Sequence, residues 1–170
     1  MPLVISDAST LIHLAAIGRL DLLKDFYGRV VIPAVVWREV VEEGKGRAGA
    51  AEVERAQRGE WIVVEAVQDT PLRRLLCRDL DEGEAEVVAL AVERSADLVL
   101  VDESEARRVA ERFGLPKTGV IGILVRAKRE GKVQSLSREL EHLRLHAGFW
   151  IEERLCREIL ASVGEKGAED

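Results

Sequence analysis

Short apolar runs alternate with amphipathic segments along most of the chain. Four runs, rich in β-branched residues, predict strands at residues 3–6, 30–32, 61–65 and 98–101. Apolar residues three and four positions apart predict helices between them, at about 8–17, 19–26, 33–43, 48–58, 82–94 and 103–113. Strands that alternate with helices are typical of a parallel sheet covered on both faces. We therefore expect an α/β fold, a three-layer α/β/α sandwich around a central parallel sheet.

The C-terminal third breaks this alternation. Three helices are predicted in succession, one after Thr118-Gly119 that ends at Gly131, one from Ser135 to about Gly148, and an amphipathic one over 149–163. We expect these extra C-terminal helices to pack outside the sheet. Residues 1–164 then form a single domain, with about 132–164 as a helical extension and 165–170 as a frayed tail. Residues 66–81 carry no clear pattern.

The composition is that of one ordinary globular domain. Of its 170 residues 47% are apolar and 33% charged, and at this size packing alone stabilises a fold. Cys77 and Cys156 stand alone, which excludes a disulfide framework and a zinc motif. With no signal peptide and no apolar stretch of ~18 residues, we expect a cytoplasmic protein without a membrane span. A net charge of −6 provides no general attraction for nucleic acid, so a polyanion must be held locally.

Two predicted strands end in an aspartate. Asp7 follows the run 3–6, and Asp102 follows the run 98–101. In open α/β sheets ligands bind at the carboxyl ends of the strands, so the two carboxylates converge if the strands are neighbours. Each aspartate also precedes a predicted helix, where a role as N-cap explains it equally simply. Both interpretations stay open at this point.

Glu84 lies on the apolar side of its predicted helix. Val87 and Val88, at i+3 and i+4, share its face. An ionised carboxylate there is costly unless it is paired or binds a metal, although its place in the first helical turn offers a simpler explanation. Glu86 points to the other side, and we expect it to be solvated.

Glu39 is a further acid, at the border of the apolar face of helix 33–43. Taken alone, it is explained as a solvated acid or as a partner for Arg38. Together with Asp7, Glu84 and Asp102 it completes a set of four carboxylates, which suits Mg²⁺ or Mn²⁺. Such an ion activates water for phosphodiester hydrolysis, so no histidine or serine nucleophile is needed. We expect the three histidines to be packing or surface residues.

At these positions the sequence resembles the PIN-domain family over about residues 3–163. The resemblance is carried by four motifs: Val4-Ile5-Ser6-Asp7-Ala8-Ser9, Val31-Ile32-Pro33 leading through Val36 to Glu39, Gly83-Glu84-Ala85-Glu86, and Leu100-Val101-Asp102-Glu103. Their order, spacing and placement on strands and helices match the family. More narrowly, the chain is similar to VapC-like members, with Thr118-Gly119-Val120 after the fourth acid and an extra helix starting Phe149-Trp150-Ile151.

The resemblance implies a metal-dependent ribonuclease site. Its catalytic and metal-binding residues are Asp7, Glu39, Glu84 and Asp102, with Mg²⁺ or Mn²⁺ as the cofactor. Two auxiliary residues accompany them: Ser9 would position the metal or water, and Glu103 would assist a second ion unless it is a solvated helix acid. The third acid is usually Asp in the family, whereas this chain has the longer Glu84.

The function expected from this resemblance is an endoribonuclease, the toxin of a VapBC-type toxin-antitoxin pair. Its partners would be RNA, a small antitoxin protein and a second copy in a homodimer. Arg38, Arg107 and Arg108 adjoin the acids and are candidates to bind the RNA backbone, with a solvated charged face as the alternative. The alternative function is a non-catalytic PIN-like module that binds RNA or protein. A phosphotransfer domain is disfavoured because Ser9 occupies the place of its second aspartate.

Overall fold

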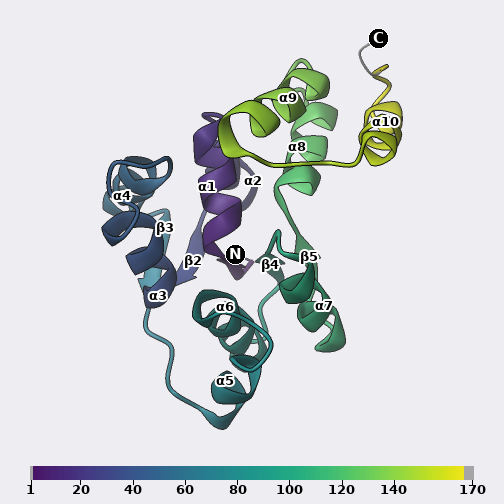
Figure 1. The fold of residues 1–170 in the computed structure, drawn as a ribbon. Coiled ribbons are helices and arrows are strands. Elements are labelled where there is room, and N and C mark those ends of the chain that lie inside the picture. The colour runs from purple at the N-terminus through teal and green to yellow at the C-terminus, as the bar shows by residue number, and fades with distance from the viewer. Residues whose placement is uncertain (1, 167–170) are drawn as a thin grey trace.

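A five-stranded parallel sheet lies at the centre of the computed structural model, which describes residues 2–166 (Figure 1). The strands are β1 (Val4–Ser6), β2 (Val30–Pro33), β3 (Ile62–Glu65), β4 (Leu98–Leu100) and β5 (Lys117–Thr118). Their order is β3-β2-β1-β4-β5, and all neighbours are parallel. Because β1 lies between β2 and β4, the chain reverses its direction of winding at β1, and such switch points are where open α/β sheets bind ligands.

Helices cover both faces of the sheet, which confirms the predicted α/β/α fold. They are α1 (Ala8–Ala16), α2 (Asp21–Tyr27), α3 (Ala34–Trp37), α4 (Ala50–Arg58), α5 (Pro71–Leu76), α6 (Glu82–Glu93), α7 (Ser104–Arg112), α8 (Val120–Arg129), α9 (Leu136–Ala147) and α10 (Glu153–Ser162). On one face α6 packs against β1, β2 and β4, between α3 and α7. On the other, α1, α8 and α9 pack together (Figure 1).

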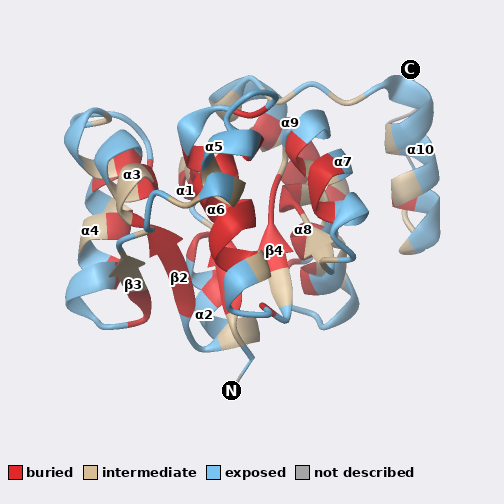
Figure 2. Ribbon diagram, turned by 90° about the horizontal axis from the view of Figure 1, so that it is seen from below, coloured by how far each residue is buried: buried red, intermediate tan, exposed pale blue. Residues whose placement is uncertain are grey.

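The three central strands and α6 lie in the middle of a hydrophobic core to which α1, α8 and α9 also contribute. Figure 2 shows buried residues along β2, β4 and α6, and residues 85–91 of α6 are all buried. The prediction that Glu86 is solvated is therefore wrong: it is only 7% exposed, and its Oε1 accepts a hydrogen bond from Arg73 Nε (3.1 Å). The reason is α5, which carries Arg73 and lies in the stretch without a clear pattern.

The segment after β2 departs from the single helix predicted over 33–43. Helix α3 ends at Trp37 and continues as a π-helical turn, η1 (Arg38–Glu42), in which the Glu43 N–H donates to Arg38 O (2.8 Å). Gly44 follows this turn, and a Cβ there would lie 2.3 Å from Val40 O. The wider turn therefore requires glycine at its end. Single π-helical turns are frequent at functional sites, and this one carries Glu39.

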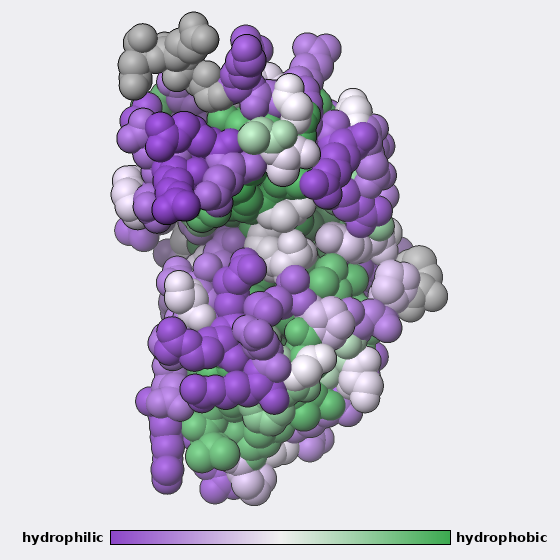
Figure 3. Space-filling model, turned by 90° about the vertical axis from the view of Figure 1, so that its right-hand side faces the viewer, coloured by the Kyte–Doolittle hydropathy of each residue, from purple (hydrophilic) through white to green (hydrophobic). Residues whose placement is uncertain are grey.

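The C-terminal helices attach to the α1 side of the sheet. Buried Glu139 of α9 pairs with Arg19, which follows α1, through two hydrogen bonds (2.6 and 3.0 Å). Residues 149–152 are not helical, so α10 begins later than the predicted 149. Its ribbon lies at the edge of the molecule (Figures 1 and 2), and its Leu160 is buried against the core. On the face that carries α10, hydrophobic surface shows between polar side chains (Figure 3), and Trp150 is 76% exposed.

The end of the described chain is anchored on α9. Glu165 accepts hydrogen bonds from the N–H groups of Leu136 (2.6 Å) and Ser137 (3.2 Å). These two groups lie in the first turn of α9 and therefore have no acceptor within the helix. Residues 167–170 of the predicted frayed tail lie outside the described residues. Within residues 2–166, none of the helices has both the length and the apolar character needed to cross a membrane.

Candidate active site

A polar pocket of about 240 Å³ lies at the carboxyl edge of the sheet. It is lined by Asp7, Ala8, Ser9, Glu39, Asp81, Gly83, Glu84 and Glu103. Five of these eight residues are acidic, and no lysine or arginine is among them. They come from the ends of β1 and β4, from the turn after β2 and from the start of α6. The fold therefore collects negative charge from four separate segments at the switch point.

Asp7 is the most buried acid of the pocket. It follows β1 and caps α1, since its Oδ1 accepts the Thr10 N–H (2.9 Å). Its Oδ2 accepts the backbone N–H of Asp102 (3.3 Å), which ties the end of β1 to the end of β4. Burial, with the charge of Asp102 nearby, raises the pKa of Asp7 to about 7. Asp7 thus combines both open interpretations, because it caps a helix and lines the pocket.

Glu84 lines the pocket from the first turn of α6. The preceding Asp81 caps this helix, and its Oδ1 accepts the Glu84 N–H (2.8 Å). Burial, the Asp81 carboxyl group and the charges of Asp7 and Glu103 together raise the pKa of Glu84 to about 8. Asp81 was not predicted as a site residue. Its signal in the sequence is an Asp three positions before a Glu at a helix start, the spacing of a capping motif.

Glu39 reaches the same pocket from the exposed η1 turn. Partial burial and the charges of Asp81 and Glu43 raise its pKa above the ordinary value. Gly83 makes room for it: a Cβ at position 83 would lie 3.3 Å from Glu39 Oε2 and 3.6 Å from Asp81 Oδ1. The absence of a side chain on Gly83 lets the two carboxylates lie next to α6.

Asp102, the remaining predicted ligand, points elsewhere. Its Oδ1 accepts the Val120 N–H (2.8 Å) at the start of α8, and its Oδ2 lies 2.8 Å from His13 Nδ1. Its side chain is 4% exposed and is not among the groups that line the pocket. The structure therefore brings Asp7, Glu39 and Glu84 together with Ser9 and Glu103, and turns Asp102 toward α8. His13, expected to be an ordinary packing residue, is its partner.

The candidate RNA-binding arginines differ in their surroundings. Arg108 pairs with Glu105 on the surface of α7 (2.9 Å). Arg107 makes only a long contact with Val101 O (3.5 Å), and neither it nor exposed Arg38 has a carboxylate within 4 Å among residues 2–166. Arg38 follows β2 and Arg107 lies on α7, which follows β4, and neither side chain lines the acidic pocket.

The donor set of the pocket fits a hard divalent cation. All its charged groups are carboxylates, which such ions prefer, and Gly83 leaves space beside them. Burial is the main cause that raises the pKa of Asp7 and of Glu84, so a cation in the pocket would favour their ionised forms. Across the described part of the chain no three Asp, Glu, His or Cys side chains already enclose one ion position. Ion binding therefore requires the carboxylates to rotate toward one another.

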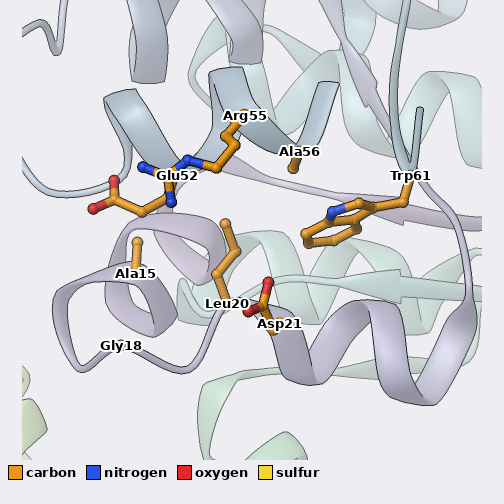
Figure 4. A pocket seen from close by; sticks show the side chains of 8 residues that line it. All are labelled: Ala15, Gly18, Leu20, Asp21, Glu52, Arg55, Ala56 and Trp61. Carbon is orange, nitrogen blue, oxygen red and sulfur yellow. The ribbon is translucent and has the colours of Figure 1, made fainter. Parts of the chain in front are cut away.

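A second cavity of about 240 Å³ lies away from this edge (Figure 4). The end of α1, the start of α2, one face of α4 and Trp61, which precedes β3, form its walls. Its charged residues are Arg55, Asp21 and Glu52, so charges of both signs line it, and the rest of its wall is largely apolar. This cavity lacks the gathering of like charges that distinguishes the acidic pocket.

Comparison with known proteins agrees with this fold. A family model described as a PIN domain matches residues 3–165. Among solved structures, the chain is similar to a PilT N-terminus domain protein, SSO1118, from the hyperthermophilic archaeon Sulfolobus solfataricus P2. The TM-score is 0.54 and the identity 18%, over 74% of this chain and 92% of that one, a likeness of fold. No curated protein matches the chain.

Proposed function

The chain belongs to the PIN-domain family, and from this premise we propose that it is a metal-dependent endoribonuclease that hydrolyses RNA phosphodiester bonds. PIN domains are in general nucleases. The observation that carries the proposal is the pocket of five carboxylates at the switch point of the sheet. A pocket so acidic repels RNA unless a cation neutralises it, and a cation is what the chemistry of hydrolysis needs.

In this proposal Asp7, Glu39 and Glu84 hold Mg²⁺ or Mn²⁺, with Asp81 beside them. When bound, such an ion supplies a Lewis acid for the scissile phosphate and a water that ionises near neutral pH. The protein's own groups prepare the pocket. Asp7 and Glu84 must release their protons to bind a cation, because only the ionised carboxylates are ligands. The Ser9 hydroxyl, at the pocket wall, orients a water or a phosphate oxygen.

The substrate would be held by arginines that follow β2 and β4, the strands whose ends also carry Glu39 and Glu103. Arg38 and Arg107 lack a carboxylate partner within the described residues, which leaves their guanidinium groups free for phosphates of the RNA backbone. Arg108 would contribute only by exchanging Glu105 for a phosphate. These contacts carry no base recognition, so the proposal does not extend to a cleavage sequence.

The biological role that we propose is that of the toxin of a VapBC-type toxin-antitoxin pair, in the cytoplasm. The support is the resemblance to VapC-like members in Gly83-Glu84-Ala85, in Thr118-Gly119-Val120 and in the C-terminal extension. A small antitoxin protein and a homodimer belong to the same proposal. The alternative, a non-catalytic PIN-like module, is an outcome of the test below.

The test is cleavage of labelled single-stranded and structured RNA by the purified chain. We expect EDTA to abolish cleavage and added Mn²⁺ to restore it. Asp7→Asn should fold and lose cleavage, whereas Glu54→Gln, a matched change of an acid paired with Arg58 on α4, should keep it. If the wild-type chain binds RNA but cleaves none with any divalent ion, the non-catalytic module replaces the enzyme. Cleavage by Asp7→Asn at the wild-type rate would contradict the site.

A further inference from the structure

We propose that Glu103 takes the fourth metal-binding position in this chain, and that Asp102 and His13 form a positioning pair that holds the pocket in shape. The inference deepens the proposed nuclease function and rests on it. It differs from the ligand set that the resemblance implies, in which Asp102 is a ligand and Glu103 an auxiliary residue. Three observations carry it.

First, both oxygens of Asp102 are already engaged. Oδ1 accepts the N–H of Val120 and Oδ2 contacts His13, each at 2.8 Å. The carboxylate only accepts hydrogen bonds, so His13 Nδ1 must be the donor. The backbone N–H of Asp102 also holds Asp7 Oδ2 (3.3 Å). Asp102 therefore joins α1, α8 and the carboxylate of Asp7, and a turn into the pocket would cost it both side-chain partners.

Second, the surroundings are built to keep Asp102 there. Gly119 has extended backbone that any residue adopts, but a Cβ on it would lie 2.3 Å from Asp102 Oδ1. Glycine is thus required for space, so that the carboxylate reaches the start of α8. From the other side Phe149 meets the His13 ring edge to face, with centroids 4.9 Å apart and planes at 78°. The C-terminal segment thereby fixes the imidazole that holds Asp102.

Third, the Glu103 side chain lies at the pocket and is not held by another residue, whereas Asp102 is turned away and held. It lines the pocket together with Asp7 and Glu84, and its carboxylate makes no hydrogen bond or ion pair within residues 2–166. The backbone turn from β4 into α7 thus sends two successive acids in different directions, one to α8 and the other to the pocket.

Two measurements on the full chain test this assignment. Titration calorimetry with Mn²⁺ alone measures ligand roles, and urea unfolding of the metal-free chain measures positioning. Glu103→Gln should weaken Mn²⁺ binding about tenfold or more, since affinity follows the number of charged ligands, and should leave metal-free stability unchanged. Asp102→Asn should keep Mn²⁺ binding within about threefold, because its backbone N–H to Asp7 remains, and should lower the urea midpoint.

His13 supplies the readout specific to positioning. His13→Ala should lower the urea midpoint as Asp102→Asn does, and His13→Asn, which offers a donor near the position of Nδ1, should recover part of the loss. In the metal-free wild type, the His13 Nδ1–H proton should give a downfield nuclear magnetic resonance signal that is absent in Asp102→Asn.

Failure of this inference is distinct from failure of the nuclease proposal. The inference is overturned if wild type binds Mn²⁺, Asp102→Asn loses that binding at unchanged stability, and Glu103→Gln binds normally. If wild type binds no Mn²⁺, the nuclease proposal and the role of Glu103 fall together. The positioning pair is still decided in that case, because unfolding of the metal-free His13→Ala variant at the wild-type midpoint would disprove it.

Discussion

The ends of β1 and β4 share one local sequence design and use it differently. In both, a buried strand is followed by an aspartate and then a helix. Asp7 caps the helix that follows it and lines the pocket. Asp102 caps α8, a helix further along the chain, and leaves the start of its own helix to Glu103. A strand end therefore sets where a carboxylate lies, while its distant neighbours decide which way it points.

The largest effect expected from this comparison is on catalysis. Asp7→Asn should reduce RNA cleavage by about a hundredfold or more, the scale of losing one charge-stabilising group in an active site. Asp102→Asn, the equivalent change at the other strand end, should reduce the cleavage rate far less, at a temperature where both variants are folded. Single-turnover cleavage measures both. Equal losses would show that the two strand ends play the same role.

A large effect on stability is expected at Gly119. Gly119→Ala places a methyl group against Asp102 Oδ1 and should destabilise the chain by about 1–3 kcal/mol, the usual cost of overpacking. In an Asp102→Ala background the same change should cost less, since the clash with Oδ1 is gone and only the 3.0 Å approaches to Val101 O and Arg107 Nη1 remain. Urea unfolding of the wild type, the two single variants and the double variant gives the coupling free energy between positions 119 and 102. Additive effects would mean that Asp102 is not held against α8.

The pH dependence of stability tests the acids that line the pocket. The pKa of Asp7, about 7, and that of Glu84, about 8, lie above their values in an unfolded chain. The folded state then holds more protons between about pH 4 and 8, so metal-free stability should fall as pH rises through that window. Glu84→Gln should flatten the fall, and Mn²⁺ should oppose it. Unfolding midpoints that rise with pH in the metal-free chain would contradict the raised pKa values.

The smallest effects concern RNA affinity. Arg38→Gln and Arg107→Gln should each weaken RNA binding several-fold and reduce the slope of log affinity against log salt by about 0.7 to 1. Arg108→Gln should change both less, because Arg108 already pairs with Glu105. Binding is measured with a non-cleavable RNA at several salt concentrations. A greater effect of Arg108→Gln than of Arg107→Gln would reverse this assignment.

The order of strands and helices was predictable because continuous apolar runs and amphipathic periodicity are local signals. Strand β5 was missed because its two residues, Lys117 and Thr118, are polar and form a short edge. The π-helical turn was missed because it differs from an α-helix by one hydrogen-bond step, which no residue pattern marks.

Within the site, the pattern identified which acids precede or begin helices, but not how they face. Asp7, Glu39 and Glu84 come from separate segments and line one pocket, and their role as metal ligands stays a prediction. The direction of Asp102 depends on His13 and Val120, which lie 89 and 18 residues away in the chain. The burial of Glu86 depends likewise on Arg73, 13 residues earlier. Side-chain direction is a tertiary property, and the periodicity of one helix does not contain it.

The most direct test is the anomalous scattering of Mn²⁺ soaked into a crystal of the chain. We expect a peak at the carboxyl edge of β1, with oxygens of Asp7, Glu39, Glu84 and Glu103 around it and with Asp102 still bonded to His13. No peak among these carboxylates in a Mn²⁺-saturated crystal would contradict the metal site. A peak bound by Asp102, with Glu103 turned to solvent, would contradict the assignment of the fourth ligand.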